Sequence, residues 1–171
     1  MSNTTISLAD TATVTTPIGP FTAVVDVDGA VLAAGWTGDV TTLTSVIHPT
    51  LRPAELRRRD ALGAVTTAII DYHAGDLTAI DGIPVRQHSG EFLLHAWDVL
   101  RKVPAGEPIT YTEFAGLAGR PAATRAAASA CARNAAALFV PCHRVLRIGG
   151  ALGGFRWGLD AKRWLLDHEG R

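Results

Sequence analysis

Residues 110–145 read TYTEFAGLAGRPAATRAAASACARNAAALFVPCHRV, and this stretch carries most of the information on the fold. Its first residue is a threonine suited to cap a helix, and Glu113 follows three residues later at the capping-box spacing. That helix ends near Gly119, and Pro121 opens a second, alanine-rich helix that extends through Ala137. Two short helices joined by a tight, glycine-containing turn predict a helix-turn-helix.

The stretch ends in a thiol beside an imidazole. Leu138–Val140 predicts a short apolar strand, and Cys142 and His143 follow it after a proline. A thiolate is a strong nucleophile, and a neighbouring imidazole can hold it deprotonated when a third group orients the ring. The spacing alone does not choose that third group among the carboxylates of the second half, which are Glu91, Asp98, Glu107, Glu113, Asp160, Asp167 and Glu169.

The alanine-rich helix has side chains too short to read base edges in a major groove, which requires several long polar groups. Small side chains instead let a helix backbone approach a narrow groove closely. The one long cation in its first half, Arg125, could then enter a base stack. This pattern favours a protein that extrudes a nucleotide over one that reads sequence, and the alternative is an ordinary buried helix.

The first half predicts strands and one helix. β-branched or alternating residues mark strands at 13–16, 21–27 and 30–36, with turns at 17–20 and 28–29. Residues 37–52 read as loop. A helix is then expected from Pro53 to Gly75, because apolar residues recur at helical spacing, namely Leu56, Leu62, Val65, Ile69 and Tyr72.

The breaker cluster at 81–84 predicts a boundary between two units, residues 1–86 and residues 87–171. The second unit also contains an apolar helix face over residues 92–103, a small hairpin over 145–152, and a last helix over 160–168. The fold class expected is α+β: a small N-terminal antiparallel sheet with a helix, then a mostly helical, winged-helix-like domain.

Composition narrows the function classes. Apolar residues make up 47% of the chain, yet no run approaches the roughly 18 residues that span a bilayer, so we expect no membrane association. Two cysteines and a polar N-terminus without a signal peptide predict a cytoplasmic protein. The net charge is zero, but every charged residue in 120–147 is an arginine, consistent with either a DNA-binding surface or solvated side chains.

The chain resembles the methylated-DNA–protein-cysteine methyltransferases, also called alkylguanine-DNA alkyltransferases. The resemblance rests on Pro141–Val145, the active-site motif of that family, and on several segments at the expected spacing: 104–111, Arg125, Asn134 eight residues before the cysteine, and 165–169. It is strong over residues 89–170, and residues 153–158 are similar to the version found in bacterial adaptive-response regulators.

This resemblance implies a DNA-repair protein that transfers an alkyl group, mainly methyl, irreversibly to itself. Cys142 would take the group from O6 of guanine, with O4 of thymine as a further substrate position. His143 would accept the thiol proton through a water, and Glu169 would orient the ring. Tyr111 would hydrogen-bond the flipped base, and Asn134 would tie the recognition helix to the active-site loop.

The resemblance also implies how DNA is held. The protein would act as a monomer on the minor groove of double-stranded DNA, with Arg125 filling the gap that the flipped base leaves. The remaining DNA contacts would come from Tyr111, Thr112, Arg120 and Ala126. The substrate pocket would be formed by Val145, Phe155, Arg156 and Trp157, with the carbonyls of Cys142 and Val145 and the backbone N–H of Arg156 facing the base.

Departures from the family pattern bear on specificity. Phe155 stands where a tyrosine is common, and the bulk of Arg156 and Trp157 would disfavour large adducts such as benzyl. Cys131 is not a family active-site position and is expected to be a small buried residue. We expect no cofactor and no metal, because the zinc-binding cysteines of some relatives are missing here.

Three alternatives compete with the repair hypothesis. A non-catalytic sensor of alkylated guanine would lack the reactive cysteine. A thiol hydrolase built on Cys142 and His143 would need an oxyanion hole, for which the sequence gives no independent sign. A helix-turn-helix regulator would need longer side chains on its recognition helix.

Overall fold

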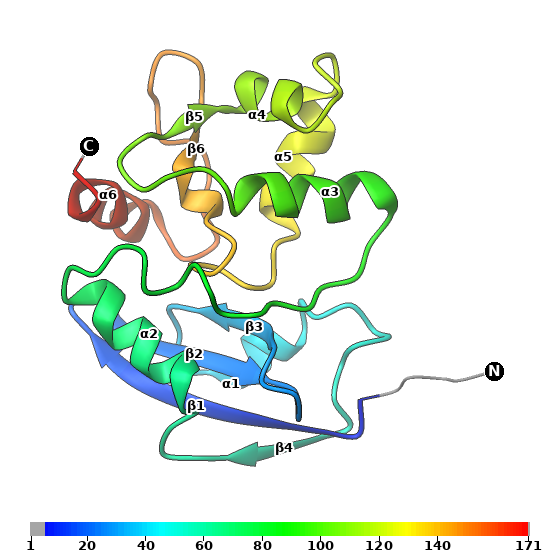
Figure 1. Cartoon of the computed structure of the whole chain (residues 1–171), viewed down its shortest axis with the longest axis vertical. Coiled ribbons are helices and arrows are strands. Elements are labelled where there is room, and N and C mark those ends of the chain that lie inside the picture. Colours follow the sequence, from blue (N-terminus) through cyan, green and yellow to red (C-terminus); the bar gives the residue numbers. More distant parts are fainter. Residues whose placement is uncertain (1–5, 171) are drawn as a thin grey trace.

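Two groups of secondary-structure elements pack against each other in the computed structural model, which describes residues 6–170 (Figure 1). The first group is built on a four-stranded sheet in the order β3-β2-β1-β4. Its strands are β1 (Leu8–Thr16), β2 (Gly19–Val25), β3 (Val31–Gly35) and β4 (Glu55–Arg58). The first three strands are antiparallel, as the two turn signals predict, and Thr16 pairs with Gly19 beside the first turn.

Two helices belong with this sheet, α1 (Val40–Thr44) and α2 (Ala64–His73). The second group contains α3 (Glu91–Leu100), α4 (Tyr111–Leu117), α5 (Thr124–Ala132) and α6 (Leu159–His168). It also contains a two-stranded sheet in which β5 (Ile109–Thr110) runs parallel to β6 (Val145–Leu146). Figure 1 shows the four-stranded sheet and α2 at one end of the molecule and α3 to α6 at the other, which confirms the α+β class.

One apolar core crosses the boundary between the two groups. It joins Phe21, Trp36 and Tyr72 of the first group to Phe114 and Leu165 of the second. Backbone pairing also crosses the boundary, because Ala34 of β3 bridges to Ala136. Burial of continuous apolar surface on both sides holds the groups together. The division into residues 1–86 and 87–171 stays a prediction.

The helix expected from Pro53 is wrong in about its first half. Residues 55–58 form β4, which pairs in parallel with β1, and α2 begins only at Ala64 after Gly63, whose φ is 59°. The side chain of Arg57 also binds Asp10 of β1 at 2.8 Å. Sheet pairing with a distant strand therefore outweighed the helical spacing of Leu56. The loop expected over 37–52 is also wrong in part, since it contains α1, capped by Asp39.

The alanine-rich segment differs from expectation after Ala132, where α5 ends. Leu138 has a φ of 76°, a conformation no strand adopts, so the predicted strand at 138–140 is absent. The hairpin expected over 145–152 is likewise wrong. Residues 147–151 make a turn, in which the N–H of Arg147 donates to Ala151, but Val145–Leu146 pairs with β5 instead.

The helix-turn-helix prediction is confirmed by α4, α5 and the turn at Gly119, whose φ is 89°. The capping box at α4 is also confirmed. The Thr110 hydroxyl accepts from the Glu113 N–H at 3.1 Å, and the Glu113 carboxylate accepts from the Thr110 N–H at 3.0 Å. Across residues 6–170, no helix has the length and apolar character needed to cross a membrane.

Gly35 provides a test of how the two groups dock. A Cβ built on it would lie 2.0 Å from the indole of Trp157, so Gly35→Ala must displace that ring. We expect a loss of about 1–3 kcal/mol in the free energy of unfolding, measured by urea denaturation. Gly38→Ala is the matched control, because its Cβ would meet Pro20 at an ordinary 3.6 Å. Equal stabilities of the two variants would contradict the close contact.

Candidate active site

Cys142 begins a single 3-10 turn, Cys142–Arg144, that leads directly into β6. Its side chain is 8% exposed and lies at the wall of a cavity of about 290 Å³. The cavity is lined by Tyr111, Ala128, Cys131, Ala132, Asn134, Cys142, Gly154, Phe155, Arg156 and Trp157.

The structure thus brings six of the residues singled out from the sequence around one cavity. They come from four separate places: Tyr111 from the start of α4, Asn134 from just after α5, Cys142 from its 3-10 turn, and Phe155 to Trp157 from the loop before α6. Val145 does not line the cavity; it is fully buried next to it. Cys131 is half-buried and does line it, which the sequence did not predict.

Behind Cys142, a buried carboxylate binds three donors. Glu169, immediately after α6, accepts from His143 Nε2 at 2.8 Å. It also accepts from two nitrogens of Arg144, at 3.0 Å and 2.9 Å. The third donor is the hydroxyl of Tyr72, at 2.6 Å, which comes from α2 of the first group. All four side chains are buried, so the ion pairs are shielded from solvent.

These bonds fix the tautomer of His143. Because Nε2 donates to Glu169, the neutral ring leaves Nδ1 as an acceptor. Nδ1 is buried and has no hydrogen-bond partner among residues 6–170. Burial lowers the pKa of His143 below its ordinary value even though Glu169 opposes that shift, since Arg144 already balances the carboxylate. The imidazole is therefore neutral at physiological pH, with a free lone pair able to take a proton.

Glu169 itself stays ionised. Burial alone would raise the pKa of this carboxyl, but the hydrogen bonds and charges of His143 and Arg144 outweigh burial and hold it well below its usual range. Tyr72 is affected in the opposite direction: burial and the neighbouring carboxylate raise its pKa, so the hydroxyl remains a donor.

Opposing effects act on the pKa of the Cys142 thiol. Burial raises its pKa above the ordinary value. A hydrogen bond with Asn134 and the charges of Lys162 and Arg156 act against that rise. In the absence of substrate the sulfur is therefore protonated at neutral pH, and a base must remove its proton for it to act as a nucleophile.

Asn134 links three segments. Its Nδ2 donates to the carbonyl of Val140 at 2.7 Å, and its Oδ1 accepts from the N–H of Ala136 at 3.0 Å. Gln87, from the connection before α3, donates to the same oxygen at 3.0 Å. The amide thereby fixes the end of α5 to the segment that leads into the Cys142 turn.

Lys162 of α6 is fully buried, which is rare for lysine. Its ammonium donates to the carbonyls of Val145 at 2.9 Å and Gly154 at 3.5 Å. It therefore joins β6 to the loop that forms one cavity wall. Burial lowers the pKa of Lys162, and the two cysteine sulfurs nearby oppose that shift.

The loop that carries Phe155, Arg156 and Trp157 is anchored on both sides. Arg156 donates to the carbonyls of Asn134, at 2.9 Å, and of Ala132 at the end of α5. Phe155 packs on Trp36 of the first group with ring centroids 6.0 Å apart, and Trp157 fits against Gly35. The cavity wall is thus held by both halves of the molecule.

Tyr111 lies opposite this loop. A Cβ on Gly153 would come within 3.3 Å of the Tyr111 hydroxyl, so the phenol is packed closely against the glycine-rich segment. Burial, with the two cysteine sulfurs, raises the pKa of Tyr111 to about 12. The hydroxyl is therefore protonated at physiological pH and able to donate a hydrogen bond into the cavity.

The other predicted DNA contacts lie outside the cavity. Arg125 is exposed near the start of α5, on the helix face that continues through Ala128 to Ala132, both of which line the cavity. Residues three and seven positions apart share one helix face. Thr112 and Arg120 are exposed on α4 and in the turn, and Ala126 is half-buried on α5. Within the described residues, no three His, Cys, Asp or Glu side chains are grouped as a metal site would require.

Roles for Tyr72, Arg144 and Lys162 were not predicted from the sequence. Arg144 was visible inside the motif, and its position beside His143 was the only signal. Tyr72 was read as one apolar position of a helix, because no local pattern shows that its hydroxyl meets a residue 97 positions later.

The chain is similar in sequence and in fold to known proteins. Residues 91–171 match the family model described as the DNA binding domain of 6-O-methylguanine DNA methyltransferase. A methylated-DNA–protein-cysteine methyltransferase of Salmonella typhimurium is 33% identical over 159 residues, or 92% of this chain and 93% of that protein. One from Mycobacterium bovis is 34% identical over 160 residues, covering 92% and 90% of the two chains. The crystal structure of Mycobacterium tuberculosis OGT in complex with DNA has a TM-score of 0.78 and 29% identity, and the match covers 94% of this chain and 92% of that one.

Removing the Tyr72 hydroxyl tests the carboxylate cluster. We expect Tyr72→Phe to lower the free energy of unfolding by about 2 kcal/mol, because Glu169 loses a charge-assisted hydrogen bond. The carboxylate then interacts more strongly with the imidazolium form of His143, so the pKa of His143, followed by NMR titration, should rise.

Thr66→Val is the control for this variant, since it removes another buried hydroxyl of α2 that bonds only backbone groups. It should leave the titration of His143 unchanged. A Tyr72→Phe protein whose His143 titrates as in the parent would show that the hydroxyl does not act on the pair.

Proposed function

Because this chain belongs to the methylated-DNA–protein-cysteine methyltransferases, we propose that Cys142 removes an alkyl group from O6 of guanine in duplex DNA. The observation that carries this assignment is the cavity of about 290 Å³ that reaches Cys142, with the neutral His143 and the ionised Glu169 behind it. A nucleophile, a base and a group that orients the base are thus present at one site.

The reaction is a single displacement. The sulfur of Cys142 attacks the alkyl carbon, the bond from that carbon to O6 breaks, and its electron pair stays with guanine. Nδ1 of His143 takes the thiol proton through a bridging water, as its unpartnered lone pair allows. The proton that left the thiol passes by way of water to guanine, which leaves neutral, and His143 returns to its neutral form. The products are S-alkylcysteine and guanine, so atoms and charge balance.

Tyr111 assists the leaving group. Its hydroxyl, with a pKa of about 12, donates a hydrogen bond to N3 of the base as negative charge develops there. The carbonyls of Cys142 and Val145 accept from the exocyclic amine, and the backbone N–H of Arg156 faces O6. Lys162 holds Val145 in place through its own bond to that carbonyl. Asn134 keeps the end of α5 against the Cys142 segment.

The base reaches this cavity by leaving the duplex. We place α5 in the minor groove, where its alanines permit close approach, and Arg125 in the space vacated by the flipped nucleotide. Extrusion costs a few kcal/mol, which intercalation and phosphate contacts offset. The hydroxyl of Thr112, the guanidinium of Arg120 and the backbone near Ala126 are suited to those phosphate contacts.

Each molecule reacts once, because the carbon–sulfur bond of a thioether is stable to water at neutral pH. The protein acts as a monomer in the reducing cytoplasm, where the two free thiols, Cys131 and Cys142, remain reduced. Methyl is the preferred group, since Trp157 and Arg156 narrow one wall. O4 of thymine presents a similar alkyl ether and is a second substrate position.

Transfer to a single sulfur can be measured by mass spectrometry. After incubation with a duplex that contains one O6-methylguanine, we expect one added methyl on the peptide that contains Cys142. Cys142→Ser should abolish the transfer but keep DNA binding. Cys131→Ser is the matched control, because that thiol lines the same cavity and should not be needed.

Two results would contradict this assignment. One is methylation of the Cys142→Ser protein. The other is tight binding of the methylated duplex by the parent protein with no gain in mass, which is the behaviour of a damage sensor rather than of an acceptor.

The role of Arg125 is tested separately. Arg125→Ala should weaken both the binding of methylated duplex and the transfer rate by about tenfold or more, equivalent to about 1.4 kcal/mol. Arg58→Ala removes an exposed guanidinium from β4, at the other end of the molecule from α5 in Figure 1, and should change neither. Fluorescence anisotropy and single-turnover kinetics give the two quantities. Equal losses in both variants would assign the effect to net charge alone.

A further inference from the structure

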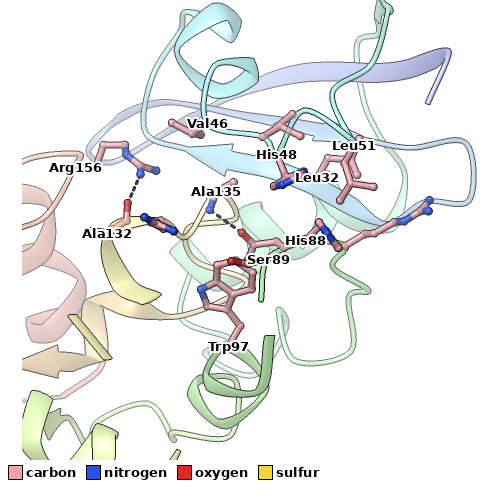
Figure 2. Close-up of a pocket in the computed structure, with 14 residues that line it drawn as sticks. Leu32, Val46, His48, Leu51, His88, Ser89, Trp97, Ala132, Ala135 and Arg156 are labelled. Atoms are coloured by element: carbon pink, nitrogen blue, oxygen red, sulfur yellow. Dashed lines mark hydrogen bonds between the residues drawn. The ribbon is translucent and has the colours of Figure 1, made fainter. Parts of the chain in front are cut away.

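A second cavity, of about 260 Å³, adjoins the reactive one at Arg156. Figure 2 shows it between the sheet of the first group and the helices of the second. The two cavities share Ala132 and Arg156 as wall residues. A ligand in the second cavity would therefore lie directly beside the reactive site.

The charges around this second cavity all have one sign. Three arginines line it, Arg86, Arg133 and Arg156, and no carboxylate does. Arg86 is partly balanced by Asp26 at 3.6 Å, and Arg156 binds only neutral carbonyls. The side chain of Arg133 has no hydrogen-bond or ion-pair partner within residues 6–170. A cavity with this charge attracts an anion.

Two histidines, His48 and His88, also line this cavity, and together with Ser89 and Arg133 they form what we call its rim. The rings of His48 and His88 meet edge to face, with centroids 4.6 Å apart. The backbone N–H of Thr50 donates to Nδ1 of His48 at 3.2 Å, so in the neutral ring the proton lies on Nε2, which becomes a donor. Ser89 and Gln87 supply further polar groups, and the side-chain oxygen of Gln87 accepts a hydrogen bond from the N–H of Ala135 at 2.9 Å, which fixes it.

The remaining walls are apolar. Leu32, Ile47 and Leu51 come from the first group, and the indole of Trp97 comes from α3. A cationic rim over an apolar and aromatic wall matches a ligand with a phosphate at one end and a flat ring at the other. The volume is close to that of the reactive cavity, which we assign to one nucleobase, so the base of a nucleotide fits inside with its phosphate at the edge. A lone phosphate would leave the apolar walls uncovered.

We propose that this second cavity binds a nucleotide, with the phosphate held by Arg133 and the rim histidines. The inference rests on the proposed function in one respect: the nucleotide is taken to belong to the DNA strand whose damaged base occupies the reactive cavity. A free nucleotide has the same chemistry, and comparing deoxyguanosine monophosphate with duplex DNA distinguishes the two ligands.

A pair of substitutions at Ser89 isolates charge from size. Ser89→Glu places a carboxylate at the rim, and Ser89→Gln places a neutral group of the same length there. Deoxyguanosine monophosphate binding is followed by NMR chemical shifts, and binding of a methylated duplex is followed by anisotropy at several salt concentrations. We expect Ser89→Glu to weaken binding about tenfold relative to Ser89→Gln, and both variants to unfold at the same urea concentration.

Arg133→Ala gives a second, independent measurement. If the ligand is a phosphate of the DNA strand, the slope of log affinity against log salt should fall by about one, and Arg133→Lys should restore it. An effect confined to the duplex identifies the strand as the source. An effect confined to the monophosphate identifies a free nucleotide.

Equal binding of both probes by Ser89→Glu and Ser89→Gln, with an unchanged salt slope in Arg133→Ala, would overturn the proposal. Methyl transfer to Cys142 at saturating duplex is measured in the same samples. A parent protein that transfers no methyl refutes the proposed function instead, so the two failures are distinguishable.

Discussion

The carboxylate of Glu169 is buried at the end of α6 and accepts hydrogen bonds from His143, Arg144 and Tyr72. Removing the charged partner, Arg144, from such a buried carboxylate would cost about 3–5 kcal/mol, so the cluster is both a structural and an electrostatic constraint. It joins α6 and the Cys142 turn to α2 of the first group. Through the tautomer it imposes on His143, it also determines which ring nitrogen can serve the thiol.

The same dependence on both halves is seen at the cavity wall. Phe155 and Trp157 rest on Trp36 and Gly35 of the first group, while Arg156 binds the end of α5. The first group does not line the reactive cavity, yet it holds the loop that does. We infer that its role is to give this loop one position, because a wall fixed by packing loses less conformational entropy when a ligand enters the cavity.

Local sequence was sufficient where the signal and the structure lie within a few residues. The capping box at Thr110 and Glu113, the glycine turn at Gly119 and the antiparallel turns of the first three strands depend on neighbours in the chain, and they were predicted. Cys142 and His143 are consecutive residues, so their proximity likewise follows from the chain itself. Local spacing failed at β4 and at Leu138, because contacts with β1 and β3 set the backbone there.

Sequence alone therefore determined the helix-turn-helix and the thiol–imidazole pair. Through the family motifs it also indicated Glu169 as the group that orients the imidazole. Only the tertiary structure decided that the cluster includes Tyr72, that Lys162 is buried beside the cysteines, and that Cys131 shares the cavity. The physical reason is sequence separation. A hydrogen bond between residues 97 positions apart leaves no periodicity in the chain, and the burial that strengthens it exists only once the two halves have packed together.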